Sequence, residues 1–294
     1  DANRALELLK NADQAMYLAK NLGRNRFCYF TASMQEKALN HLELMNDLRQ
    51  AISLNQLTVV YQPIIELDSS IIRKAEALLG WNHPVRGMVS PAEFIPLAEE
   101  SGLIVEIGDW VFKEAVKHIK KCKEQLGIEI QVSVNKSPVE FREVNGSFDW
   151  LSYLTENQLS GKNIVIEITE GLLMDNNQQT MEQLSRYRAA DIKLSMDDFG
   201  TGYSSLSYLK KFELDYLKID QSFTKNLAQE SEDMILSEAI ITMAQKLGLK
   251  VIAEGIETEE QRKLLLESGC DYGQGYYFSR PIEGEAFLKL LDSN

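Results

Sequence analysis

The sequence predicts an α/β fold, a TIM-like (β/α)8 barrel whose first strand runs antiparallel to the others. From Thr58 onward the chain contains eight short apolar runs, and each of the last six follows a segment with helical periodicity. Alternating strands and helices are typical of a parallel sheet. Between Leu67 and Ile71, however, lie only residues 68–70, whereas a parallel crossover needs about a dozen residues or more. We therefore expect the first two strands to form an antiparallel hairpin.

The helices between the strands have recognisable start and stop signals. One helix is expected over 231–247, where Ser231 can cap the first turn and Gly248 can end the last. The next begins with a capping box of Thr258 and Gln261, over 258–268. The apolar stripe expected on the first of these helices is Leu236, Ile240, Met243 and Leu247. The predicted strands are 58–66, 71–81, 129–135, 163–168, 192–198, 214–220, 249–254 and 272–278.

The first part of the chain has a different pattern. Residues 3–20 have helical periodicity, and Arg26–Phe30 predicts a short strand. So small a helix and strand cannot bury a core of their own, which indicates the end of a preceding domain. The expected organisation is a domain tail over 1–32, a connecting helix over 33–55 and the barrel over 56–294.

Composition narrows the function further. A net charge of −13 repels long polyanions, so we expect no nucleic acid polymer as a partner. No apolar run approaches the roughly 18–20 residues of a membrane span, so no membrane contact is expected from this segment. The three cysteines lie far apart and argue against disulfides or a thiolate zinc site, which fits a reducing cytoplasm. A metal here would have to be bound by oxygen ligands.

Polar residues lie near the carboxyl end of nearly every predicted strand, where barrel enzymes carry their chemistry. They are Glu76, Asn135, Glu167 and Glu170, Asp197 and Asp198, Lys218 and Asp220, Glu254, and Gln274. Each alone has an ordinary explanation, such as a solvated side chain, a helix cap, or a turn beginning at Asp198. Those explanations do not predict that six successive strands direct an oxygen ligand or a charge at one rim. Such an acidic cluster is costly unless cations bind to it.

The oxygen ligands in this cluster suit Mg²⁺ or Mn²⁺, which prefer carboxylate and amide groups and retain water. Those ligands are Glu76, Asn135, Glu167 and Asp197, with Asp198 alongside. Two adjacent aspartates can serve two neighbouring ions, an arrangement that stabilises the attacking and leaving oxygens in phosphoester cleavage. The barrel itself does not decide between reactions, because many chemistries use that fold.

Over about residues 40–294 the sequence resembles the EAL-domain family of cyclic di-GMP phosphodiesterases. The resemblance rests on the order and number of short motifs. They are Glu76-Ala77-Leu78, Tyr61-Gln62-Pro63-Ile64, Val134-Asn135, Glu167-Ile168-Thr169-Glu170, Asp197-Asp198-Phe199-Gly200-Thr201-Gly202, Lys218-Ile219-Asp220, Ala253-Glu254-Gly255 and Gln274-Gly275-Tyr276. The resemblance implies that a metal-activated water attacks phosphorus in cyclic di-GMP, expels a 3′ oxygen and gives linear pGpG.

The resemblance also implies a role for each residue in the set. Two divalent ions would be bound, one by Glu76, Asn135, Glu167 and Asp197, the other with its waters by Asp197, Asp198 and Asp220. Glu254 would be the general base, Lys218 would hold the attacking water, and Gln274 would bond within the water network. Glu170 would brace the loop Asp198–Ser205, which couples metal binding to the substrate and to dimerisation. The residues implied to lie at the substrate are Gln62, Leu79, Gly80 and Asp220.

One position departs from the family pattern. The family usually has Glu-Ala-Leu-x-Arg-Trp, but Gly80 stands at the Arg position before Trp81. The missing side chain normally contacts a substrate phosphate, a charge-assisted bond worth roughly 1.5–3 kcal/mol. We expect weaker substrate binding with the metal ligands intact. The alternative that this position favours is a cyclic di-GMP receptor that binds without cleaving.

The N-terminal segment resembles a second family. Ala12-Asp13-Gln14-Ala15-Met16-Tyr17 and Gly23-Arg24-Asn25 are similar to the closing helix of a GGDEF, diguanylate-cyclase-like domain. This resemblance implies upstream GGDEF and sensor domains in the full protein. Membrane anchoring, if the full protein has it, would then come from N-terminal segments outside this sequence. The EAL resemblance implies a homodimer formed through barrel surfaces near the Asp198–Ser205 loop.

Overall fold

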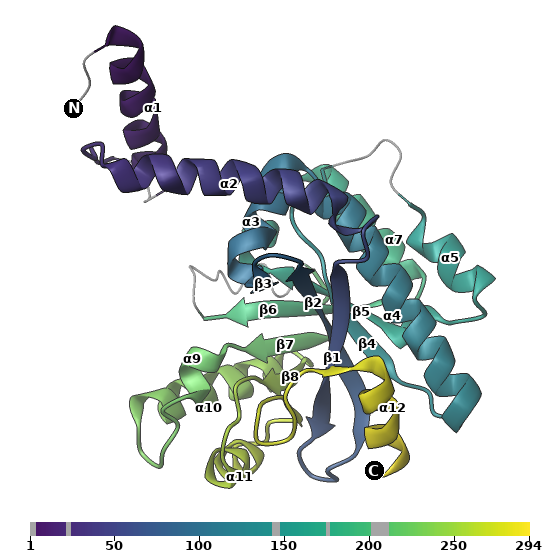
Figure 1. Cartoon of the computed structure of the whole chain (residues 1–294). Coiled ribbons are helices and arrows are strands. Elements are labelled where there is room, and N and C mark those ends of the chain that lie inside the picture. Colours follow the sequence, from purple (N-terminus) through teal and green to yellow (C-terminus); the bar gives the residue numbers. More distant parts are fainter. Residues whose placement is uncertain (1–3, 22–24, 143–147, 175–176, 201–211) are drawn as a thin grey trace. The chain divides into compact units, whose positions relative to one another are not determined.

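The structure, a computed structural model, describes residues 4–21, 25–142, 148–174, 177–200 and 212–294 (Figure 1). The chain divides into two compact units. The helical unit comprises Asp1–Gln56 and Trp81–Ser101, and the barrel unit comprises Leu57–Gly80 and Gly102–Asn294.

The barrel unit is built on a closed ring of eight strands. Around the ring the order is β1-β9-β8-β7-β6-β5-β4-β2, and pairing of β1 with β2 closes it. The strands of the sheet are β1 (Leu57–Glu66), β2 (Ile72–His83), β4 (Gln131–Asn135), β5 (Ile164–Thr169), β6 (Lys193–Phe199), β7 (Tyr216–Ile219), β8 (Lys250–Ala253) and β9 (Tyr272–Gly273), with β10 (Ile282–Glu283) beside β1. The (β/α)8 prediction is confirmed.

The first strand is reversed, as the short connection predicts. β1 pairs antiparallel with β9, with Ile65 opposite Gly273, whereas β2 pairs parallel with β4. The connection between β1 and β2 is tight, since the amide of Glu66 donates to the carbonyl of Ile71 at 3.1 Å. Because β1 runs the other way, its amino-terminal end lies at the rim where the other strands end.

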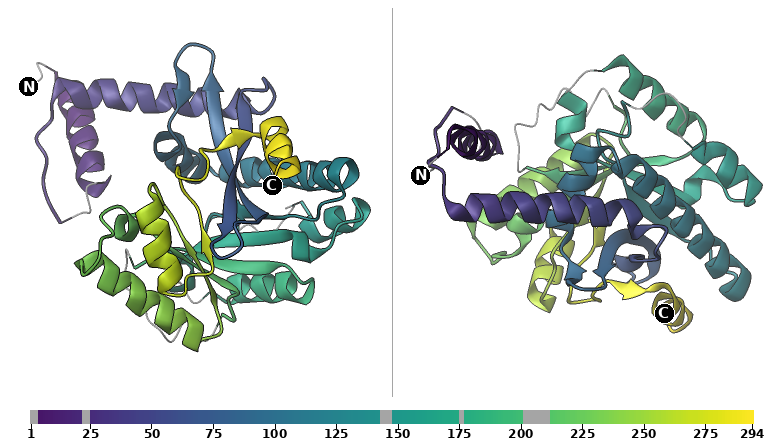
Figure 2. Two further views of the ribbon diagram at one scale, coloured as in Figure 1. Left: turned by 90° about the horizontal axis from the view of Figure 1, so that it is seen from below. Right: turned by 45° about the horizontal axis from the view of Figure 1, so that its top comes forward.

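Helices lie outside the strands of the barrel unit (Figures 1 and 2). α4 contacts β4, α7 contacts β6, α10 contacts β7 and β8, and α12 contacts β1. The helices are α4 (Ile104–Leu126), α5 (Trp150–Glu156), α6 (Glu170–Met174), α7 (Gln178–Ala189), α9 (Gln221–Thr224), α10 (Glu232–Lys246), α11 (Glu259–Glu267) and α12 (Gly284–Asp292), and a 3₁₀ turn spans Gly161–Asn163.

The helix-end signals are confirmed, but the predicted apolar face of α10 is wrong at Leu236 and Leu247, while Ile240 of that face is buried. The Ser231 hydroxyl accepts from the amide of Met234, and Thr258 and Gln261 form the capping box of α11. In α10, however, Leu236 is 47% and Leu247 40% exposed. The buried side is Met234, Ser237, Ile240, Ile241 and Ala244. Because apolar residues occur on both sides of this helix, the pattern alone does not select the face that packs on the sheet.

The last strand is shorter than the sequence predicts. The predicted strand 272–278 contains only the two residues of β9. The chain then turns, because the Gln274 carbonyl accepts from the amide of Ile256, and the amide of Tyr277 bonds to the Ile256 carbonyl. Gln274 therefore stands at the end of β9.

The helical unit contains α1 (Ala5–Asn21), α2 (Ala32–Ala51), β3 (Gly87–Val89) and α3 (Pro91–Ser101), together with the end of β2. Within it, β3 pairs antiparallel with β2, and Asp47 of α2 contacts His83 at 3.2 Å. The predicted strand Arg26–Phe30 is wrong, since these residues form no strand in the structure. None of the described helices combines the length and apolar character needed to cross a bilayer.

Candidate functional site

A bulge in β6 brings two adjacent aspartates to one edge of the barrel. Met196 lies opposite Leu217 of β7, and Phe199 lies opposite Ile219, so Asp197 and Asp198 together face one residue. That residue is Lys218. Asp198 has a φ of +54°, in the left-handed region that few side chains adopt. Adjacent strand residues ordinarily point to opposite faces, and a bulge with this twist relaxes that alternation.

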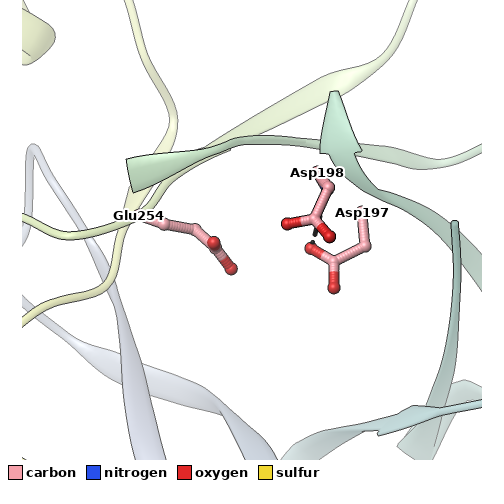
Figure 3. Close-up of side chains that lie close together, drawn as sticks. All are labelled: Asp197, Asp198 and Glu254. Atoms are coloured by element: carbon pink, nitrogen blue, oxygen red, sulfur yellow. Dashed lines mark hydrogen bonds between the residues drawn. The ribbon is translucent and has the colours of Figure 1, made fainter. Parts of the chain in front are cut away.

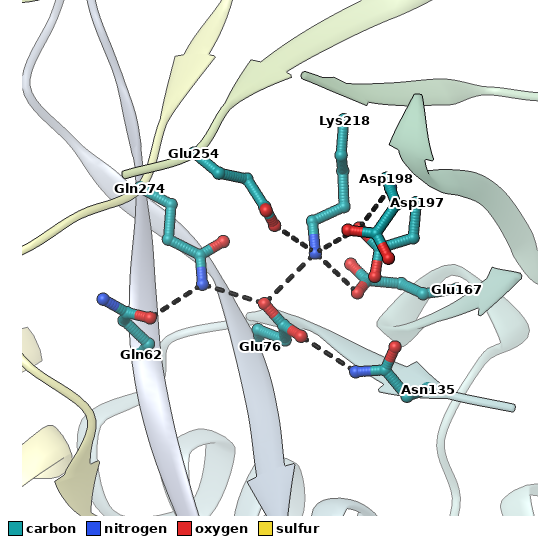
Figure 4. Close-up of polar contacts among 9 residues, drawn as sticks. All are labelled: Gln62, Glu76, Asn135, Glu167, Asp197, Asp198, Lys218, Glu254 and Gln274. Carbon is teal, nitrogen blue, oxygen red and sulfur yellow. Dashed lines mark hydrogen bonds and ion pairs between the residues drawn. The ribbon is translucent and has the colours of Figure 1, made fainter. Parts of the chain in front are cut away.

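Four carboxylates from different strand ends surround the ammonium of Lys218 (Figure 4). The Lys218 side chain is 1% exposed. Its Nζ lies 2.6 Å from Glu254, 2.8 Å from Glu167, 3.1 Å from Asp197 and 3.2 Å from Glu76. One cation therefore lies among four carboxyl groups, and their negative charge exceeds its positive charge unless protons or further cations bind.

Neutral amides hold the Glu76 carboxylate from both sides (Figure 4). Asn135 Nδ2 donates to one oxygen at 2.8 Å, and Gln274 Nε2 donates to the other at 2.8 Å. Gln274 also donates to Gln62 Oε1 at 3.0 Å, and Gln62 Nε2 donates to the Ser279 carbonyl at 3.1 Å. This chain of bonds joins β4, β2, β9 and β1 and fixes the orientation of Glu76.

Burial and neighbouring charges shift the pKa values of the carboxyl groups in this cluster in different directions. Burial acts to raise the pKa of Glu76, but Lys218 and the two amide donors bring it below its ordinary value. Burial and then the Glu76 charge hold the pKa of Glu167 well above its usual range. Burial raises the pKa of Glu254 to about 7, against the opposing attraction of Lys218. Burial, Asp197 and Asp220 raise the pKa of Asp198. These raised values express the cost of crowding anions without enough counter-charge.

The donor set fits divalent metal ions. Carboxylate oxygens of Asp197, Asp198 and Glu254 all lie within 4.8 Å of one another (Figure 3). Glu167 Oε1 and Gln274 Oε1 are buried and have no hydrogen-bond partner in the described part of the chain. Buried oxygens without donors beside a surplus of carboxylates form an environment that a hard cation stabilises.

Two further predicted residues have other contacts as well. The charge of Asp220 acts on Asp198, and its side chain also accepts from the amide of Ser222 and caps α9. Glu170 begins α6, and both of its carboxylate oxygens are buried without a hydrogen-bond partner among the described residues. Of the Asp198–Ser205 loop, residues 201–205 lie outside the described residues.

A cavity of about 290 Å³ opens onto the cluster. It is lined by Gln62, Glu76, Leu78, Asp197, Lys218, Gln221, Glu254, Gly255, Glu257, Gln274, Gly275 and Tyr276. Leu78 shares the Glu76 side of β2 and lines the cavity, whereas Leu79 and Gly80 are not among the lining residues, so their substrate contacts stay predictions.

Several lining residues had no role assigned from the sequence, although Leu78, Gly255, Gly275 and Tyr276 belong to the family motifs. Gly255 follows Glu254 and has a φ of +68°. A Cβ at Gly255 would lie 2.6 Å from the Cβ of Gln221, so the close approach of α9 needs glycine. Gln221 and Glu257 had no signal, because single polar residues in loops rarely indicate a site.

Comparison with known proteins identifies the family. The model of the EAL domain matches residues 45–281. The chain belongs to the EAL domain family. This EAL domain is 38% identical over 288 residues to the bifunctional diguanylate cyclase/cyclic di-GMP phosphodiesterase MucR of Pseudomonas aeruginosa, covering 98% of this chain and 42% of the relative. It is 39% identical over 291 residues to the cyclic di-GMP phosphodiesterase NbdA of the same organism, covering 99% and 37%.

A solved structure, described as the PaMucR phosphodiesterase in complex with c-di-GMP, has the same fold. It matches with a TM-score of 0.78 and 37% identity, over 83% of this chain and 99% of that one. The chain spans about two fifths of the length of the curated relatives it matches.

Proposed function

We propose that this EAL domain hydrolyses cyclic di-GMP to linear pGpG in bacterial second-messenger signalling. The observation that carries the proposal is the ring of carboxylates around Lys218, which leaves excess negative charge beside a cavity. An anionic substrate does not bind to such a site without cations. The relatives named as cyclic di-GMP phosphodiesterases support the choice of substrate.

The proposed cofactors are two Mg²⁺ or Mn²⁺ ions. The ligands proposed for one are Glu76, Asn135, Glu167 and Asp197, and for the other Asp197, Asp198 and Asp220. Bound ions of this kind lower the pKa of water and offset charge on the phosphate. The bulge in β6 supports the assignment, because it lets Asp197 and Asp198 face the same side of the barrel.

In the proposed reaction, a water oxygen bonds to phosphorus while the bond from phosphorus to the 3′ oxygen breaks. Glu254 accepts the proton of the water, and a pKa raised to about 7 suits a group that exchanges protons near neutral pH. The 3′ oxygen takes up a proton from solvent as it leaves, and Glu254 afterwards releases the proton of the water to solvent. Lys218 holds the attacking water, and its contact with Glu254 at 2.6 Å keeps the two groups together. Gln274 orients Glu76.

The decisive experiment is incubation of the purified chain with cyclic di-GMP and Mg²⁺ or Mn²⁺, followed by chromatography of the nucleotides. We expect pGpG to accumulate with the metal and not with a chelator. Tight binding of cyclic di-GMP with no pGpG under any metal would instead establish the receptor alternative, which Gly80 favours.

Three further proposals concern context. Residues 1–32 are the tail of a GGDEF-like domain, and residues 33–55 are a connecting helix. The matches to relatives cover 98–99% of this chain and therefore begin before residue 45, where the match to the EAL domain begins, which supports a shared preceding segment.

The barrel pairs as a homodimer, which light scattering tests. The domain acts in the cytoplasm, where its nucleotide substrate is found.

A further inference from the structure

The cavity lacks a cation for part of the proposed substrate. Four of its lining residues are acidic, namely Glu76, Asp197, Glu254 and Glu257, and Lys218 is the one basic side chain among the described lining residues. Lys218 is already in contact with four carboxylates. Cyclic di-GMP carries two phosphates, and the metal site serves only the one that reacts. The second phosphate therefore needs a positive group at the rim of the cavity.

Neither position 80 nor the next arginine along the chain supplies that group. Gly80 has no side chain to offer. Arg86, the nearest basic residue after it in sequence, donates to Asn40 Oδ1 and pairs with Glu43 at 3.0 Å. Its guanidinium is thus held by partners within the helical unit.

The Arg280 guanidinium stacks on the ring of a residue that lines the cavity. Its Cζ lies 4.3 Å from the ring centre of Tyr276, which lines the cavity and is 53% exposed. The backbone beside it is anchored, since the Ser279 carbonyl accepts from Gln62. Stacking on an aromatic ring leaves the N–H edge of a guanidinium free for an anion.

Gly80 and the Arg280 segment flank β1 on opposite sides. On one side the Thr58 hydroxyl lies 3.5 Å from the Gly80 carbonyl oxygen. On the other side, β10 begins two residues after Arg280, and its first residue, Ile282, pairs with Tyr61 of β1. Both segments thus lie against the first half of β1.

We infer that Arg280, stacked on Tyr276, binds the second phosphate of cyclic di-GMP and takes over the contact that position 80 cannot make. The inference rests on the proposed function. Arginine suits this role because its planar fork makes paired hydrogen bonds to phosphate oxygens.

The test compares Arg280→Ala, Arg280→Lys, Gly80→Arg and the double variant Arg280→Ala/Gly80→Arg in steady-state cleavage of cyclic di-GMP. Arg280→Ala should raise KM about tenfold, the low end for a charge-assisted hydrogen bond at an exposed site. Arg280→Lys should lie between, because it keeps the charge and loses the fork. Gly80→Arg should restore KM in the Arg280→Ala background. Lys246→Ala, an exposed charge at the end of α10, is the control for net charge.

The salt dependence of KM distinguishes direct binding of phosphate by Arg280 from an indirect role in positioning the Tyr276 ring. The KM difference between the native chain and Arg280→Ala should shrink as ionic strength rises, because the contact is charged. An unchanged KM, or a loss that ignores salt and is not restored by Gly80→Arg, overturns the inference. If the native chain itself produces no pGpG, the proposed function fails instead, so the two failures are distinguishable.

Discussion

The two ends of the barrel interior are built from the same strands but differ in charge balance. At the carboxyl ends of the strands, Lys218 lies among four carboxylates. Lys74, two residues before Glu76 on β2, lies at the other end, where its hydrogen-bond partners are neutral. Its Nζ donates to Gln131 Oε1 and to the Tyr216 hydroxyl at 2.6 Å, and lies 5.0 Å from the ring centre of Tyr272.

The difference teaches how the fold separates stability from chemistry. Charge around Lys218 raises its pKa well above the ordinary value despite burial, whereas burial lowers the pKa of Lys74 to about 8. The Lys74 end has matched donors and acceptors. The Lys218 end has an excess of acceptors, which costs stability and creates a demand for cations.

The largest effect should come from removing an anionic ligand at the Lys218 end. Glu76→Ala or Asp197→Asn should abolish cleavage of cyclic di-GMP, because each deletes a carboxylate proposed to bind metal. Lys74→Met, at the other end, should keep turnover close to that of the native chain. Near-normal turnover of either acidic variant, with folding verified by circular dichroism, would reject the metal assignment.

A smaller loss is expected at Glu254. Glu254→Gln keeps shape and hydrogen bonding but cannot accept a proton, so turnover should fall about 10²–10⁴-fold while substrate still binds. Single-turnover kinetics and equilibrium binding measure the two quantities separately. Weakened binding with unchanged turnover at saturation would make Glu254 a substrate anchor and not the base.

Metal binding should appear in stability as well as in activity. At a metal concentration about a hundred times the Kd, Mg²⁺ or Mn²⁺ should raise the melting temperature by about 5 °C, since binding to the folded state alone stabilises it. Asp197→Asn should remove most of this rise, and Lys74→Met should retain it. Calorimetry measures the rise in each variant. An equal rise in both would mean that the stabilising ions bind at another site.

The sequence predicted the barrel well because its evidence is local. Periodicity located the strands, and the short connection 68–70 required the reversed β1. Motif order located the carboxylates. The bulge was not predictable, since strict alternation would send Asp197 and Asp198 to opposite faces. The sequence pattern also could not show which carboxylates contact Lys218, because they come from four strands and lie together only in the closed barrel.

The smallest predicted effect concerns pH and the Lys74 end. Burial lowers the pKa of Lys74 from 10.5 to about 8 in the folded chain. Between these values the unfolded chain binds more protons, so the stability of the native chain should rise with pH across this window. Relative to Lys74→Met, the free energy of unfolding should gain about 1–2 kcal/mol between pH 7 and about 9.5, a figure reduced for partial exposure of the side chain.

Urea unfolding of both chains at several pH values measures this gain. Burial raises the pKa of Tyr216 and of Tyr272 in the folded chain, which opposes the gain as pH approaches 10, but both chains contain these tyrosines and their contribution cancels in the comparison. If the free energy of unfolding changes with pH by the same amount in the native chain and in Lys74→Met, Lys74 keeps its proton throughout this window. The Lys74 end would then hold a charge as firmly as the Lys218 end, and the contrast between neutral and acidic surroundings would no longer explain why chemistry is found at only one of them.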